Sequence, residues 1–409
     1  MLTPYQLGKL PDNISNIYQQ LENFIIEDIS RRVAKVGKIT ETAEWQATRA
    51  QEFGMSLETL EKKIAEILNL SFDEVEDLFE QSAVESIKTD SVLYEQAKLT
   101  PMHLDTSPEL KGYLEAAITQ TKGELKNISQ SLGFCIKGIN GKIKNKKLTQ
   151  FYQETLDLAQ FQVSSGVIDY NTAVKNAVKS MTRSGVRFID YESGWSNRVD
   201  VAVRRATLTG ANQMSQQMNV KTIEDLETDI VEVTAHSGAR PSHAKWQGKW
   251  YSLSGKSTKY PSLRKVTHYG EGDGLGGWYC RHQFYAVIPG VSTPTYTEEQ
   301  LKNIDPEPFG YKGKTYTHYE ATQYQRKIET AMRETKREQI GFKAAGLDED
   351  FTNSSIKLQR QKQEYKDFSN AAGLRQKKER AQVLGYNKSI SQKSVWANKK
   401  AENKMQEDK

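Results

Sequence analysis

The chain has 409 residues, of which 37% are hydrophobic and 27% charged, and its mean hydropathy of −0.70 argues against a single large hydrophobic globule. We expect two or three units, with one modest core and elongated helical parts. Its two cysteines, Cys135 and Cys280, exclude a disulfide framework and fit assembly in a reducing cytoplasm. The first residues lack a signal-peptide pattern, and no apolar run approaches the roughly 18 residues of a membrane span, so we expect a soluble protein.

The net charge of +5 hides an asymmetry along the chain. Residues 1–110 hold 10 Lys and Arg against 20 Asp and Glu, whereas residues 321–409 hold 20 against 12. Two interpretations remain open. The basic end could bind nucleic acid through non-specific phosphate contacts, or the charges simply coat exposed helix faces, which is the commoner case.

Residues 1–110 are predicted to form an acidic helical region. Apolar residues recur at steps of three and four over 14–33 and again over 57–68, which predicts two amphipathic helices. Ser71 followed by Glu74 has the form of a capping box and indicates the start of a third helix.

Residues 111–228 are predicted to form a second helical region, interrupted by a Lys-rich exposed turn at 133–147. The pattern changes at 229–290. The β-branched and aromatic runs Ile230–Thr234 and Phe284–Ile288 predict two strands of a small sheet. We expect this core module to be the only sheet-containing part of the chain.

Pro289, just before it, and three prolines within it mark residues 291–320 as a linker. Helical spacing returns over 321–390, a basic helical region, and the polar tail 391–409 is predicted to be disordered. The predicted fold class is therefore α+β and predominantly helical, with elongated helical flanks around a small β-containing core module rich in His, Trp and Cys.

Chemistry-bearing residues concentrate in this core module. His236 and His243 follow the first predicted strand, and Cys280 and His282 precede the second. A His pair and a Cys-x-His pair supply four ligands of the types that a tetrahedral Zn²⁺ site uses, although the spacing is not that of a standard zinc finger. The alternative is that the four residues are hydrogen-bonding anchors of a small β-core, so a structural zinc ion remains one of two possibilities.

The same residues also allow two enzymatic interpretations. Cys280 and His282 could form a nucleophile and base, but the sequence identifies no oxyanion hole or substrate pocket. The His cluster beside a basic tail could belong to a metal-dependent nuclease or another enzyme acting on nucleic acid. Neither interpretation assigns a catalytic residue, and we do not expect an enzyme.

The segments His236–Trp250 and Gly274–His282 resemble the signature of the tailed-phage minor capsid protein 2 family, which is itself similar to MuF-type head morphogenesis proteins. The opening Met1–Tyr5, the segment Arg204–Thr209 and the basic helical tail agree with this resemblance. It implies a structural protein of the phage head, made in the host bacterial cytoplasm. The expected partners are the portal protein, other capsid proteins and packaged DNA, the last through non-specific basic contacts.

Overall fold

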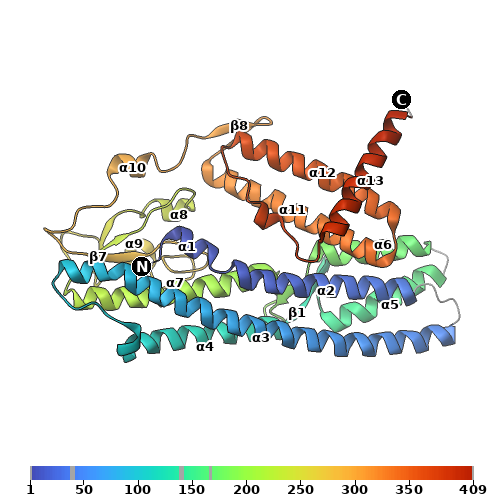
Figure 1. Cartoon of the computed structure of the whole chain (residues 1–409), viewed down its shortest axis with the longest axis horizontal. Helices are drawn as coiled ribbons and strands as arrows, with labels where there is room; N and C mark the ends of the chain where they lie inside the picture. Colours follow the sequence, from blue (N-terminus) through green and yellow to red (C-terminus); the bar gives the residue numbers. More distant parts are fainter. Residues whose placement is uncertain (1, 37–41, 138–141, 165–167, 408–409) are drawn as a thin grey trace. The chain divides into compact units, whose positions relative to one another are not determined.

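The computed structural model describes residues 2–36, 42–137, 142–164 and 168–407, whose contacts divide the chain into two compact units. Unit 1 and unit 2 are each assembled from three separate stretches of sequence, and several long helices contribute residues to both (Figure 1). Unit 1 comprises Met1–Ser15, Leu70–Lys126 and Val203–Thr322, and unit 2 comprises Asn16–Asn69, Asn127–Ala202 and Gln323–Lys409.

Most of the described chain is helical, as predicted. The helices are α1 (Pro4–Lys9), α2 (Asp12–Val36), α3 (Thr42–Gln96), α4 (Pro108–Gln130), α5 (Leu148–Ser164), α6 (Tyr170–Ser184), α7 (Val199–Asp225), α8 (Pro241–Ala244), α9 (Leu263–Thr267), α10 (Glu298–Lys302), α11 (His318–Ala345), α12 (Asp348–Ala371) and α13 (Lys388–Glu407). Two short 3₁₀ turns, η1 (Leu104–Thr106) and η2 (Lys378–Ala381), complete the set. None of the described helices is long and apolar enough to span a bilayer.

Helix α2 confirms the first predicted apolar stripe, since Ile14, Leu21 and Ile29 are fully buried. The second and third predicted helices are instead one continuous helix, α3. Ser71 lies inside α3 and is fully buried, so the predicted helix start there is wrong. Neither Gly nor Pro separates the two predicted helices, and the chain therefore continues without a break.

Unit 2 contains a four-stranded antiparallel sheet with the order β2-β1-β3-β4. Its strands are β1 (Leu132–Lys137), β2 (Ile143–Lys147), β3 (Arg187–Ile189) and β4 (Ser196–Arg198). The prediction that only residues 229–290 contain a sheet is therefore wrong. Strand β2 escaped prediction because its Lys-rich sequence shows no apolar alternation, and residues 138–141 of the predicted turn lie outside the described residues.

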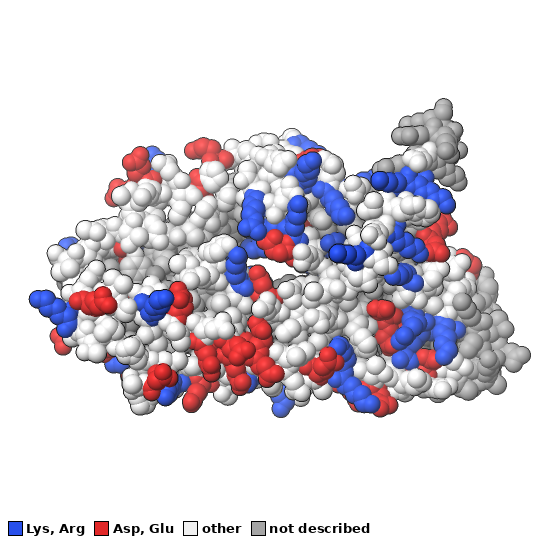
Figure 2. Space-filling model, in the orientation of Figure 1, with Lys and Arg blue, Asp and Glu red and all other residues white. Residues whose placement is uncertain are grey.

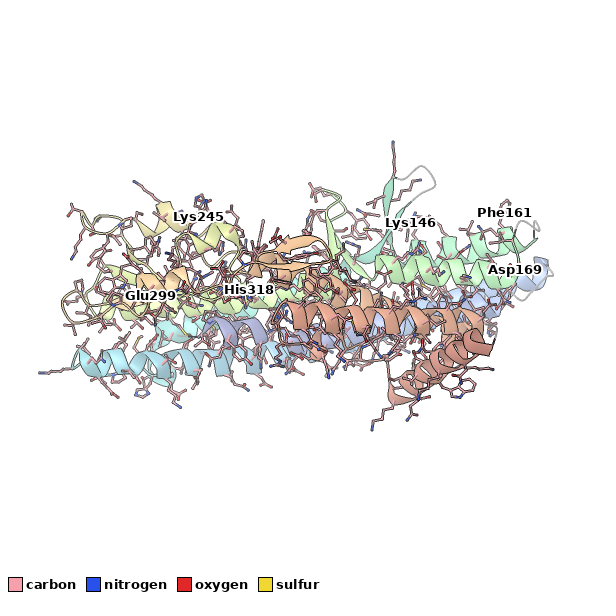
Figure 3. All side chains as sticks on the ribbon, turned by 90° about the horizontal axis from the view of Figure 1, so that it is seen from above. Lys146, Phe161, Asp169, Lys245, Glu299 and His318 are labelled. Carbon is pink, nitrogen blue, oxygen red and sulfur yellow. The ribbon has the colours of Figure 1, made fainter. Side chains whose placement is uncertain are left out.

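Unit 1 contains the predicted core module as a three-stranded antiparallel sheet with the order β6-β5-β7. Strands β5 (Ile230–Val233) and β7 (Phe284–Val287) confirm the two predicted strands, and β6 (Trp250–Ser252) is an unpredicted third. Helix α7 packs on this sheet, since Ile223 shares a buried cluster with Val231 and Phe284. The label of Lys245, which follows α8, locates the module in Figure 3.

The predicted linker 291–320 contains α10 and a hairpin of β8 (Phe309–Tyr311) and β9 (Lys314–Tyr316). The start of this segment is hydrogen-bonded to the core module, because the Thr295 amide donates to both carboxylate oxygens of Glu232 at 3.1 and 3.2 Å.

The predicted disordered tail forms α13 instead, which packs against α12. Ile390, Ser394 and Ala397 are buried along α13 at helical spacing. Small and polar residues make up much of this face, which is why the apolar periodicity was not visible in the sequence. Residues 408 and 409 lie outside the described residues.

Candidate functional site

Three of the four predicted ligands meet inside the core module of unit 1. His243 belongs to α8, and Cys280 and His282 lie in the segment that leads into β7. Cys280 Sγ is 3.8 Å from His243 Nδ1 and 3.7 Å from His282 Nδ1. One ligand atom from each residue lies within 4.8 Å of the other two, and the three residues are only 1–2% exposed. We call His243, Cys280 and His282 the Cys–His cluster.

The fourth predicted ligand, His236, lies beside the Cys–His cluster and not in it. Its ring stacks on the ring of His282, with centroids 4.4 Å apart. Its Nδ1 lies 3.0 Å from the Ser237 carbonyl oxygen and 3.3 Å from Arg281 Nη2. In the described arrangement His236 therefore covers one face of the His282 ring.

Two hydrogen bonds determine which ring nitrogens face the thiol. His243 Nε2 donates to the backbone carbonyl of Asp273 at 2.8 Å, and His282 Nε2 donates to Gln247 Oε1 at 3.1 Å. Carbonyl oxygens only accept, and a neutral imidazole carries a single N–H. Both Nδ1 atoms are therefore left with a lone pair on the side of Cys280.

The Gly-rich loop before Cys280 is closed by contacts that leave no room for a side chain. A Cβ on Gly274 would lie 2.0 Å from the His268 carbonyl oxygen, and one on Gly277 would lie 2.4 Å from the Gly272 carbonyl oxygen. Asn212, which is fully buried on α7, then donates to the Cys280 carbonyl at 2.8 Å. The loop and α7 together fix where the cysteine sulfur lies.

Trp246 closes the cluster on another side. Its ring centroid is 4.5 Å from that of His243 and 4.8 Å from that of His282, and the residue is buried. Trp278, in contrast, is 56% exposed although it stands only two residues from Cys280. Trp246 therefore packs against the Cys–His cluster, whereas the Trp278 side chain is largely exposed.

Burial disfavours the charged forms of the cluster residues. Burial, with smaller contributions from neighbouring imidazoles, lowers the pKa of His282 well below its usual value, and burial also lowers the pKa of His243. It raises the pKa of the Cys280 thiol, against a smaller opposing effect of the Gly276 and His282 backbone. Without a bound cation, the cluster consists of a neutral thiol and two neutral imidazoles.

A nucleophilic cysteine needs a thiolate and an accessible sulfur. Cys280 has a raised pKa and is 2% exposed. A pocket of about 200 Å³ is lined by α7, the Gly-rich loop and Trp278, but none of the three cluster residues lines it. The geometry suits a cluster that holds chain segments together better than one that attacks a substrate.

Two residues of this site were not among the predicted ones. Gln247 accepts from both the His236 amide and His282 Nε2, each at 3.1 Å, and Asn212 holds the backbone of Cys280. Gln247 could have been suspected, because it follows His243 by four residues within the His236–Trp250 motif. Asn212 could not, since it lies on a helix whose place beside the module is set by the tertiary fold.

The fold and the site define a predominantly helical α+β protein with a small sheet module closed around a buried Cys–His cluster. A family model described as Phage minor capsid protein 2 matches residues 2–370. The protein therefore belongs to this family, as its motifs predicted, and is a structural protein of a bacteriophage head, with other head proteins as its partners. No curated protein and no solved structure matches the chain.

Proposed function

We propose that the protein works at the portal or in the head interior, as a non-enzymatic component of head assembly. The observation that carries this proposal is the family match over residues 2–370. The buried Cys–His cluster supports the non-enzymatic part, because its reactive atoms lack a path to a macromolecular substrate in the described part of the chain.

The geometry gives little support to the nuclease alternative. A metal nuclease needs a coordination position that a phosphodiester can reach, with a base near it. The Cys–His cluster is enclosed by Trp246 and His236. We expect purified protein to leave DNA and RNA intact when Mg²⁺, Mn²⁺ or Zn²⁺ is supplied, and metal-dependent cleavage that co-purifies with the protein would overturn the non-enzymatic assignment.

Contact with packaged DNA is proposed for the basic C-terminal helices. Figure 2 shows Lys and Arg side chains over α11, α12 and α13, with fewer acidic ones between them. Exposed basic residues there include Lys343, Lys357, Arg360, Lys366 and Lys393. No known DNA-reading motif was recognised in this region, so we expect weak, sequence-independent binding that falls steeply as salt is raised.

Protease protection of purified particles tests the location. A protein of the head interior is digested only after the heads have been opened, whereas a protein on the outer surface is digested in intact heads. Chemical cross-linking of intact particles followed by mass spectrometry then tests for the portal as a neighbour. Digestion in intact heads together with absence of portal cross-links would contradict the proposed location.

A further inference from the structure

We propose that His243 Nδ1, Cys280 Sγ and His282 Nδ1 are the three protein ligands of a structural zinc ion. The proposal goes beyond the role in the head and does not depend on where in the particle the protein works. It rests on a count of protons, on distances, and on the groups that hold the two imidazoles.

The count of protons favours a cation at the centre of the Cys–His cluster. Three atoms with lone pairs converge there, and both imidazole protons are already donated outward, to the carbonyl of Asp273 and to Gln247. The thiol offers one proton, which can serve only one acceptor at a time. At least one buried Nδ1 therefore has no donor from the described residues, which is costly for a group buried in a core. A cation bound by the thiolate satisfies all three atoms at once.

The distances agree with zinc. Bonds of about 2.3 Å to sulfur and 2.0–2.1 Å to nitrogen at a tetrahedral angle place a sulfur and a nitrogen ligand about 3.6 Å apart. Cys280 Sγ lies 3.8 and 3.7 Å from the Nδ1 atoms of His243 and His282. Both sulfur–nitrogen distances are therefore within about two tenths of an ångström of the value in a zinc site. Cysteine sulfur and imidazole nitrogen are also ligand types that Zn²⁺ commonly has in proteins.

The groups around the two histidine ligands are those expected around a bound metal ion. Imidazoles that bind a metal usually donate their other N–H to a carbonyl or carboxylate, which sets the tautomer and the orientation of the ring. The Asp273 carbonyl and Gln247 perform this role for His243 and His282. Gln247 is itself held by the His236 amide, and it is 3% exposed.

The zinc ion would join two segments that are distant in sequence. His243 lies in the short helix α8, 37 residues before Cys280, and much of the chain between them is loop. Metal binding is coupled to folding, so such a cross-link adds to the stability that the buried apolar cluster of the module provides. Within the described residues no fourth His, Cys, Asp or Glu belongs to the group, so the protein side chains supply three positions of a tetrahedral ion.

The test begins with metal analysis of the full-length protein purified without chelators, followed by removal of the metal and titration with Co²⁺. We expect close to one equivalent of zinc. Cobalt should give the visible bands of a tetrahedral site and a thiolate-to-metal charge-transfer band in the near ultraviolet. The charge-transfer band requires a cysteine ligand, so the native protein alone tests the proposal even if a variant fails to fold.

Two cysteine variants identify the ligand. Cys280→Ala should abolish the charge-transfer band, whereas Cys135→Ser should keep it, because Cys135 lies in β1 of unit 2 and contacts Asn145 and Ser196 instead. Gln247→Ala should weaken zinc binding by about 10–100-fold, the usual effect of losing a group that orients a ligand.

Three results would overturn the proposal. One is native protein that neither retains zinc nor takes up cobalt, in which case a buried water satisfies the imidazoles. Another is a charge-transfer band that survives Cys280→Ala or is lost in Cys135→Ser. The third is complete loss of metal in His236→Ala, which would show that the stacked His236 is a ligand and that the three-ligand assignment is wrong.

Discussion

Replacing Glu22 in unit 2 should be far more damaging than replacing its buried partner Arg337. Both residues are fully buried and form an ion pair. Glu22 Oε1 also accepts from the Val186 amide and from Arg198 Nη2, each at 3.1 Å. Arg337 is held less well, because its Nε and Nη1 have no hydrogen-bond partner among the described residues. Burial, which outweighs the attraction of Glu22, lowers the pKa of Arg337 to about 10.

The expected losses of stability follow from this difference in hydrogen bonding between Glu22 and Arg337. Glu22→Gln removes the carboxylate charge that the guanidinium groups of Arg198 and Arg337 share, and breaking a buried pair from one side costs about 3–5 kcal/mol. Arg337→Met also removes a charge partner, but it eliminates two unsatisfied donors that cost about 1–3 kcal/mol each when buried. Glu22 then keeps Arg198 and the Val186 amide. We therefore expect Arg337→Met to change the free energy of unfolding by no more than about 1 kcal/mol.

Hydrogen exchange followed by mass spectrometry measures the effect within unit 2, since a chain with two units need not unfold in one step. Peptides of α2 and α11 should lose protection in Glu22→Gln and keep it in Arg337→Met. Glu58→Gln is a matched control, because its ion pair with Lys62 is exposed on both sides and should leave protection unchanged. If Arg337→Met lowers the protection of unit 2 as much as Glu22→Gln does, the inference that Arg337 is the poorly hydrogen-bonded partner is refuted.

Three further predictions concern other parts of the chain. Gly274→Ala should destabilise the core module by about 2–3 kcal/mol, because the added Cβ meets a backbone carbonyl, and thermal melting of the variant checks this. Deleting 391–409 should lower the melting temperature of unit 2, because Ser394 is buried and accepts from Gln339 at 3.1 Å, and an unchanged melting temperature would show that α13 does not stabilise the unit. Burial alone would raise the pKa of Asp200, but neighbouring arginines lower it. Its stabilisation is therefore complete above about pH 4 and is lost as the pH falls through the lower folded-state pKa, so Asp200→Asn should flatten the acid limb of a stability–pH curve.

The sequence predicted elements whose apolar pattern is decided locally and missed those decided by tertiary contacts. The stripe over 14–33 became α2 because most of its apolar positions are buried. Strand β2 has no such pattern, and it exists because Gly133 to Lys137 pair with it in register. Ser394 on α13 is buried and accepts a hydrogen bond from Gln339, and the spacing of apolar residues does not reveal such a contact.

The candidate site was predictable to the extent that strand pairing determines it. Strand β5 ends at Val233 and pairs with Phe284 at the start of β7, so residues after β5 and before β7 must lie close together. That register accounts for the meeting of His243 with His282. It does not determine which of two histidines enters the cluster. The turn at Gly238, whose φ is +70°, and the start of α8 decide this, and they leave His236 stacked against the outside of His282.

The two buried polar clusters differ in how their groups are satisfied. In unit 2, Glu22 accepts two hydrogen bonds and also forms an ion pair with Arg337. Arg337 itself has donors without an acceptor among the described residues, so an apolar side chain of similar length can replace it. In unit 1, the Cys–His cluster presents three acceptors and one proton, so the thiol can satisfy at most one of the two Nδ1 atoms. Buried donors without acceptors lower the stability of the fold. Buried acceptors that converge on one point and share too few protons are instead satisfied together by a bound cation. The two units therefore lead to opposite expectations for the same experiment: removing a buried polar partner should be tolerated at Arg337, and should cost unit 1 its bound metal at Cys280.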